Sequence, residues 1–203
     1  MESSFKALTR IYTQAHQWDA LIKLFETAAD QAADEDLKLT YLFKTGALYE
    51  DALGRPERAA EVYRRILRVA PKNLGAIHAL ERAAESAGKY KDVIDALRKE
   101  TELTRDQKRL VELNQKIAEI YADKLEELEA ALATWQAALA LSPDDPEIAS
   151  RINTLIASAV LVVLVGITVL YAMTGHLNMG MVAETLQKLG PAGPAVLLAA
   201  AAL

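Results

Sequence analysis

Hydrophobic and polar positions follow the period of an α-helix through most of the chain. In four stretches the apolar positions lie four and three residues apart, which places them on one face of a helix. No alternating pattern typical of a β-strand accompanies them, so the pattern predicts an all-α protein. The predicted anchors of these four helices are Leu21/Phe25/Ala28, Ala59/Tyr63/Ile66, Val93/Leu97/Glu100 and Ala131/Trp135/Ala138.

The four helices belong to a repeating unit. An aromatic or small residue closes the helix that precedes each of them, at Tyr12, Tyr49, Ala84 and Tyr121, with spacings of 37, 35 and 37 residues. Gly54 and Gly88 mark the turn between the two helices of a unit, and Pro71 and Pro143 end two units, since proline cannot continue a helix interior. Residues 1–151 are therefore predicted to form about four helical hairpins and the start of a fifth.

One unit, "GALYEDALGRPERAAEVYRRILRVAP", resembles the tetratricopeptide repeat, a helix–turn–helix unit of about 34 residues whose copies stack into a solenoid. The resemblance covers roughly residues 3–151. Units two and four carry one extra residue in the inter-helix turn, unit one has an acidic connector ("DQAADED"), and Glu100 stands at a small-residue position. An unrelated helical bundle is the alternative, but a bundle has no reason to repeat its anchors at this period.

The resemblance implies that the first helix of each unit lines a concave, partner-binding face. That face looks basic toward the N-terminal units, which would suit an acidic peptide, although no Lys–Asn pair of the kind that grips a terminal carboxylate is present. Solvated helix faces without a ligand are the alternative. The candidate partner-binding residues are Lys6, Arg10, Gln14, Lys44, His78, Arg82, Gln115 and Glu119.

The pattern changes after Thr154. From Leu155 to Met173 the chain is apolar on every side, and these 19 residues would extend about 28 Å as a helix, close to the ~30 Å of a hydrocarbon core. Asp145 and Pro146 are a suitable N-cap and first helical residue, so residues 152–175 are predicted to be a transmembrane helix that continues the last repeat helix. Its predicted membrane-spanning residues include Leu155, Val160, Leu164, Ile167, Leu170 and Met173.

Residues 176–203 are predicted to form a short amphipathic helix at Met181–Leu189, followed by a truncated apolar segment that is re-entrant or interfacial. The stretch "VAETLQKLGPAGPAVLLAAAAL" resembles the opening of the DedA (SNARE-associated Golgi protein) membrane family, and this resemblance covers about residues 155–203. It implies an integral membrane topology and an N-terminal fragment of a longer lipid or solute transporter. No functional residue follows from it.

Charge is confined to the first part of the chain. All but one of the 23 basic residues (Lys188) and all but one of the 28 acidic residues (Glu184) precede Ile152, so the net charge of −5 belongs to the repeats. Interspersed signs with a net negative balance argue against a nucleic-acid partner. The absence of cysteine excludes disulfides and thiolate chemistry, and the three histidines show no metal-ligand spacing. We expect no enzyme activity, no catalytic residue, no metal and no cofactor.

These patterns predict a membrane-anchored scaffold that binds a partner protein or peptide through its repeats and the bilayer through residues 155–173. Because the N-terminus shows no cleavable signal pattern, the repeats are expected in the cytoplasm, and the composition favours a bacterial inner membrane. Arg151 and Lys188 flank the span equally, so charge does not set the orientation. A DedA-like transporter with regulatory repeats is the alternative, and an artificial join of two reading frames is a third possibility.

Overall fold

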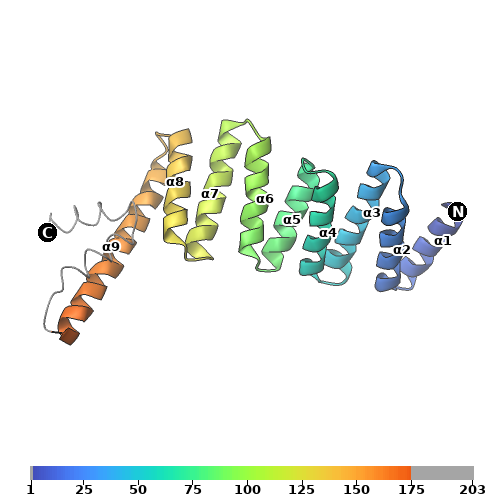
Figure 1. Cartoon of the computed structure of the whole chain (residues 1–203), viewed down its shortest axis with the longest axis horizontal. Coiled ribbons are helices and arrows are strands. Elements are labelled where there is room, and N and C mark those ends of the chain that lie inside the picture. Colours follow the sequence, from blue (N-terminus) through green and yellow to red (C-terminus); the bar gives the residue numbers. More distant parts are fainter. Residues whose placement is uncertain (1, 175–203) are drawn as a thin grey trace. The chain divides into compact units, whose positions relative to one another are not determined.

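The computed structural model describes residues 2–174, and this part of the chain is helical without β-strands (Figure 1). The chain divides into two compact units, Met1–Thr104 and a second unit that begins at Arg105. In the first unit each helix packs against the next, as do α7, α8 and α9 in the second. The helices are α1 (Glu2–Gln14), α2 (Trp18–Gln31), α3 (Glu35–Ala47), the π-helix η1 (Leu48–Ala52), α4 (Pro56–Val69), α5 (Leu74–Ser86), α6 (Tyr90–Leu103), α7 (Gln107–Asp123), α8 (Leu128–Leu141) and α9 (Pro146–Thr174).

Helix pairs α1/α2, α3/α4, α5/α6 and α7/α8 correspond to the four predicted hairpins, and the same turn closes each of them. One residue in every turn has a positive φ: His16 (52°), Gly54 (59°), Gly88 (67°) and Glu126 (56°). The next backbone N–H donates to the carbonyl oxygen of the residue that the repeat spacing had singled out. These bonds are Gln17 to Tyr12 (2.9 Å), Arg55 to Tyr49 (2.7 Å), Lys89 to Ala84 (2.9 Å) and Glu127 to Tyr121 (2.8 Å).

The extra residue predicted in the turns of units two and four is present, and the structure shows how it is accommodated. The closing hydrogen bond spans six residues there, from Arg55 to Tyr49, instead of the five of units one and three. In unit two the preceding helix widens into η1, where the Leu53 N–H donates to the Leu48 carbonyl oxygen at 3.1 Å. A π-type widening absorbs one inserted residue without breaking the helix.

The positive-φ turns lead to a stability prediction. Glycine adopts this conformation without cost, whereas an L-residue pays about 1–2 kcal/mol, so Glu126→Gly is expected to raise the free energy of unfolding by roughly 1 kcal/mol. Glu127→Gly is the comparison variant, because Glu127 has a φ of −90°, where glycine relieves no backbone strain and adds entropy to the unfolded chain. Chemical denaturation of the full chain in mild detergent, followed by circular dichroism, measures both. A loss of stability in Glu126→Gly would contradict this account.

The predicted anchors form the core, with one exception. Tyr63 and Trp135 are buried, as are the other anchors, except that Ala28 is half-buried and its neighbour Ala29 takes the core position. Tyr63 needs a glycine opposite it, because a Cβ on Gly46 would lie 2.6 Å from the ring carbon Cζ of Tyr63. The hydrophobic effect of these packed side chains holds the hairpins together.

Helix α9 begins as a repeat helix and continues beyond it. The Asp145 carboxylate caps it, accepting from the backbone N–H groups of Glu147 (2.9 Å) and Ile148 (3.2 Å), and Pro146 is its first residue. Ile148 and Ile152 are buried with Trp135 of α8 in one core cluster. The helix then continues without interruption to Thr174, for 29 residues in all. The predicted helix at Met181–Leu189 and the apolar segment after it lie outside the described residues.

Candidate functional site

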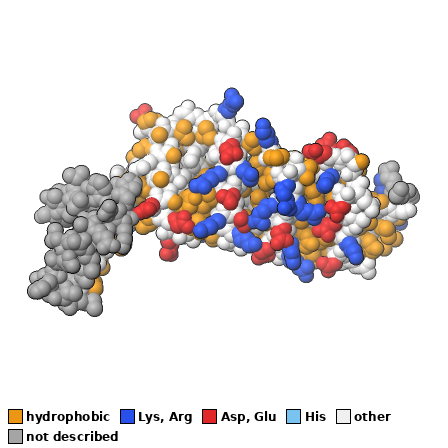
Figure 2. Space-filling view, in the orientation of Figure 1, with side chains coloured by type: hydrophobic (Ala, Val, Ile, Leu, Met, Phe, Trp, Pro, Cys, Tyr) orange, Lys and Arg blue, Asp and Glu red, His pale blue; other side chains and the backbone are white. Residues whose placement is uncertain are grey.

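The candidate partner-binding residues lie on the first helices of the units, α1, α3, α5 and α7, as the repeat pattern predicts. Lys6, Arg10 and Gln14 are exposed on α1, and Lys44 is exposed on α3. On the other two helices, His78, Arg82 and Glu119 are exposed and Gln115 is half-buried. Figure 2 shows basic and acidic side chains interspersed on one face of the repeats.

Arg82 is held by an internal carboxylate. Its Nε and Nη2 atoms donate to the two carboxylate oxygens of Glu50, at 3.1 and 2.9 Å, and the Glu50 side chain is only 12% exposed. The hydroxyl of Tyr63 donates to the same carboxylate at 2.5 Å. The hydrogen bond to Glu50 is the main reason why the pKa of Arg82 is raised. A bidentate pair of this kind is among the stronger polar contacts in proteins, so Glu50 fixes the orientation of the Arg82 guanidinium and offsets its charge.

His78 has a similar internal partner. Its Nε2 atom lies 3.0 Å from Oε2 of Glu100, whose side chain is 7% exposed while that of His78 is 51% exposed. The acidic residue at the small position of unit three is therefore a buried hydrogen-bonding partner of α5, the first helix of the same hairpin. Glu50 and Glu100 are thus the internal partners of Arg82 and His78, the two candidates on α5.

Lys44 lies against an aromatic cluster. Its Nζ atom is 5.6 Å from the ring centroid of Phe25, within the range of a cation–π interaction. Phe5 and Tyr41 complete the cluster. The ring centroid of Phe5 lies 6.1 Å from that of Phe25 and 5.2 Å from that of Tyr41. This cluster attaches α1 to α2 and α3.

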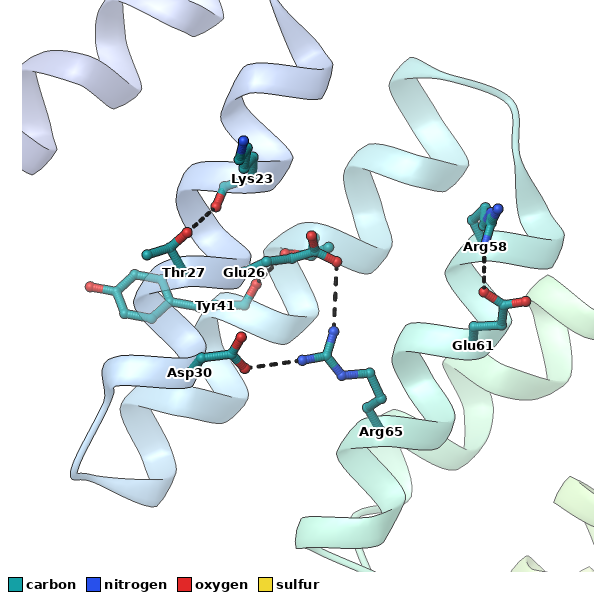
Figure 3. A network of polar contacts seen from close by, with 9 residues as sticks. Lys23, Glu26, Thr27, Asp30, Tyr41, Arg58, Glu61 and Arg65 are labelled. Carbon is teal, nitrogen blue, oxygen red and sulfur yellow. Dashed lines mark hydrogen bonds and ion pairs between the residues drawn. The ribbon is translucent and has the colours of Figure 1, made fainter.

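The second helices are joined by a separate set of ion pairs. Figure 3 shows the guanidinium of Arg65 on α4 between two acids of α2, at 3.6 Å from Glu26 and 3.2 Å from Asp30. Arg64, the preceding residue, pairs with Asp92 of α6 at 2.5 Å. These residues are partly exposed, and such pairs contribute little individually. They link α4 to α2 and to α6 in the first unit.

A groove of about 390 Å³ lies along α7 in the second unit. Gln115 and Lys108 both line it. The connection between α8 and α9 closes the other side, where the side-chain amide of Gln107 donates to the carbonyl oxygen of Leu141 at 2.5 Å. The lining residues are Gln107, Lys108, Val111, Glu112, Gln115, Leu141, Ser142 and Asp145. These residues place amide, hydroxyl and charged groups beside the apolar side chain of Val111.

The network around Glu50 is expected to make the free energy of unfolding fall at alkaline pH. Burial, followed by the hydrogen bond to Glu50, raises the pKa of the Tyr63 hydroxyl above its ordinary value. Above pH ~10 the unfolded chain releases this proton and the folded chain keeps it, so stability is present below that pH and falls as the pH rises, by up to ~1.4 kcal/mol per pH unit. Tyr63→Phe removes the proton and is expected to flatten this slope, as measured by denaturation between about pH 9 and 11. Parallel slopes in the two proteins would contradict the assignment.

The other candidate surface is α9. Among its exposed side chains after Ser158 the large ones are apolar, namely Leu161, Val162, Val165 and Val169, each at least half exposed (62%, 69%, 52% and 51%). Of the predicted membrane-spanning residues, Leu155, Val160, Leu164 and Ile167 are half-buried. Leu170 and Met173 lie in the helix, and their side chains are outside the described set. By length and composition, Pro146–Ile167 is the one helix among the described residues that can cross a membrane.

Comparison with known proteins identifies the repeat. Residues 4–39, which contain the first hairpin and the start of α3, match the family model of the tetratricopeptide repeat. Hairpins of this kind are typically non-catalytic modules for protein interaction. The match confirms the predicted repeat type over its 36 residues, and the equivalent turns of the other hairpins follow the same geometry.

Solved structures similar to the chain include a "Crystal structure of MamA protein", at 16% identity and a TM-score of 0.47, covering 93% of this chain and 91% of that chain. Another is "MamA 41-end from Desulfovibrio magneticus RS-1", at 14% identity and a TM-score of 0.44, covering 92% of each chain. Similarities at these scores carry no inference about function. A search of curated proteins found no match. The resemblance to the DedA family receives no support from these comparisons, and residues 175–203, more than half of that stretch, lie outside the described residues.

Proposed function

We propose that the protein is a membrane-attached scaffold whose helical repeats bind a partner protein or peptide. The single observation that carries the membrane part is α9, which is a packed repeat helix at its start and an apolar, exposed helix further on. The tetratricopeptide match and the groove along α7 support the partner-binding part.

The properties of α9 favour lipid over a protein core as its surroundings. A core helix of a soluble protein is mostly buried, whereas only 22% of the apolar window in Pro146–Ile167 is buried. Glu147 and Arg151 carry charge and Ile148 and Ile152 pack on α8, so the first two turns belong to the repeats. The uncharged part from Leu155 onward is the segment that we assign to the bilayer, with the repeats on its cytoplasmic side.

Vesicle flotation of the full chain tests the membrane part. The protein is diluted from detergent with phosphatidylcholine vesicles, and we expect it to float with them and to resist extraction at alkaline pH. External protease should then digest the repeats and spare the part of α9 that lies within the bilayer. A chain that stays monodisperse in detergent-free buffer and does not float would refute the membrane attachment.

Paired variants of the full chain test the partner-binding part. Lys108→Glu with Gln115→Ala alters the α7 groove, and Lys72→Glu with Gln136→Ala makes the same chemical changes at exposed positions outside it. We expect a bound protein to be retained by the native chain and the control and lost from the groove variant. Equal retention by both variants would place the binding surface elsewhere.

A further inference from the structure

The α7–α8 turn lies at the end of the hairpin toward which α9 extends. α8 and α9 are consecutive packed helices joined by a short connection, Ser142–Asp145, so they run in opposite directions (Figure 1). From Leu141 back to Leu128, α8 rises by about 20 Å. The same rise from Pro146 along α9 ends at Ala159, so the start of α8 and the turn before it are level with the part of α9 around that residue.

The turn and the start of α8 are acidic. Glu126, Glu127 and Glu129 are exposed there, together with Asp123 at the end of α7, while Lys124 is the basic residue of the turn. Along α9, in contrast, the last charge among the described residues is Arg151. The carboxylates are thus level with a part of α9 that is already uncharged.

The character of the exposed α9 surface changes at the same level. Thr154, Ala157 and Ser158 are exposed, and the hydroxyls of Thr154 and Ser158 donate to backbone carbonyl oxygens of their own helix, at 2.9 and 2.8 Å. Large exposed apolar side chains begin only at Leu161, which is 62% exposed. Carboxylates cannot enter hydrocarbon without a large cost, so the acidic turn limits how deeply α9 is immersed.

We propose that the acidic α7–α8 turn lies at the lipid headgroups and that the membrane partner of α9 is a surface of zwitterionic lipid. This inference rests on the proposed membrane attachment and names its lipid class. The exposed face from Leu161 onward contacts the acyl chains, while Glu126, Glu127 and Glu129 lie in the headgroup layer. Anionic lipids would repel these carboxylates over the distance of a Debye length, which is about 10 Å at 0.1 M salt.

Flotation of the full chain with two kinds of vesicle tests the proposal. At low salt we expect vesicles of phosphatidylcholine to bind the protein on the order of tenfold better than vesicles that contain about 30% phosphatidylglycerol, because several like charges oppose each other at short range. Raising the salt to about 0.5 M should remove most of this difference. Equal binding at low salt would overturn the proposal and leave the membrane attachment intact, whereas binding to neither vesicle would overturn the attachment as well.

Two matched variants locate the effect. Glu126→Gln with Glu129→Gln removes two charges from the proposed headgroup level, and Glu112→Gln with Asp144→Asn removes two exposed charges from the first half of α7 and the α8–α9 turn. The first pair is expected to reduce the lipid discrimination severalfold, and the second pair to preserve it. Equal behaviour of the two pairs would show that net charge alone decides, and would overturn the role of the turn.

Single cysteines give an independent measurement of depth, since the native chain has none. In vesicles, a water-soluble maleimide is expected to label Ser158→Cys and to spare Val165→Cys, while both should react in the denatured chain. Labelling of both positions, or protection of both, would place the headgroup level away from the acidic turn and overturn the proposal.

Discussion

Arginine at both Val162 and Val165 is expected to prevent the full chain from floating with lipid vesicles. These side chains are 69% and 52% exposed on α9 and lie on one face, one helical turn apart. On the membrane-insertion scale an arginine near the centre of a transmembrane helix costs roughly 2.5–3.5 kcal/mol, so two together outweigh much of the gain from the apolar residues. The helix itself should persist, because arginine is a good helix former.

The matched control places the same two charges on α8. Ala133 and Ala137 are exposed one turn apart, and Ala133→Arg with Ala137→Arg is expected to leave flotation unchanged. If the α9 variant floated as well as the native chain, exposed apolar residues on α9 would not be the membrane contact.

Trp135→Ala is expected to lower the free energy of unfolding by about 3–5 kcal/mol, the range for removing a buried aromatic side chain. Trp135 is 3% exposed and packs with Leu132, Ile148 and Ile152, so it joins α8 to α9. Its loss leaves a cavity at the position where α9 is attached to the repeats. Denaturation followed by circular dichroism, with the full chain in mild detergent, measures the change.

The other tryptophan provides the control. Trp18 is half-buried at the start of α2, so Trp18→Ala is expected to cost clearly less than Trp135→Ala. The variant Trp18→Phe leaves Trp135 as the one tryptophan, and its emission then reports unfolding of the α8–α9 contact directly. Equal destabilisation by the two alanine variants would contradict the burial described for Trp135.

Sequence periodicity predicted the hairpins because the repeat depends on local chemistry. The carbonyl groups of Tyr12, Tyr49, Ala84 and Tyr121 close equivalent turns, and Gly54 and Gly88 supply the positive φ that two of these turns need. His16 and Glu126 adopt the same conformation without the glycine, so the spacing of the anchors was the stronger signal.

The candidate site was less predictable, because it depends on contacts between residues far apart in the chain. Helical position placed His78 and Arg82 on α5, but their partners Glu100 and Glu50 are 22 and 32 residues away. Which carboxylate reaches which cation depends on the rotation of each helix about its axis, and the hydrophobic pattern fixes that rotation only coarsely. The close approach of Gly46 to Tyr63 escaped the sequence for the same reason.

Because α9 is one uninterrupted helix, its length fixes both the distance and the rotation between the repeats at its start and the apolar segment at its end. Each residue added to an α-helix turns everything beyond it by 100° and lengthens it by 1.5 Å. If α9 is held in a bilayer, as we propose, one alanine inserted after Ile156 would therefore rotate the α7–α8 hairpin about the axis of α9 and turn its groove to face another direction. An insertion of seven residues, close to two full turns, would raise the hairpin by about 10 Å and nearly restore its heading.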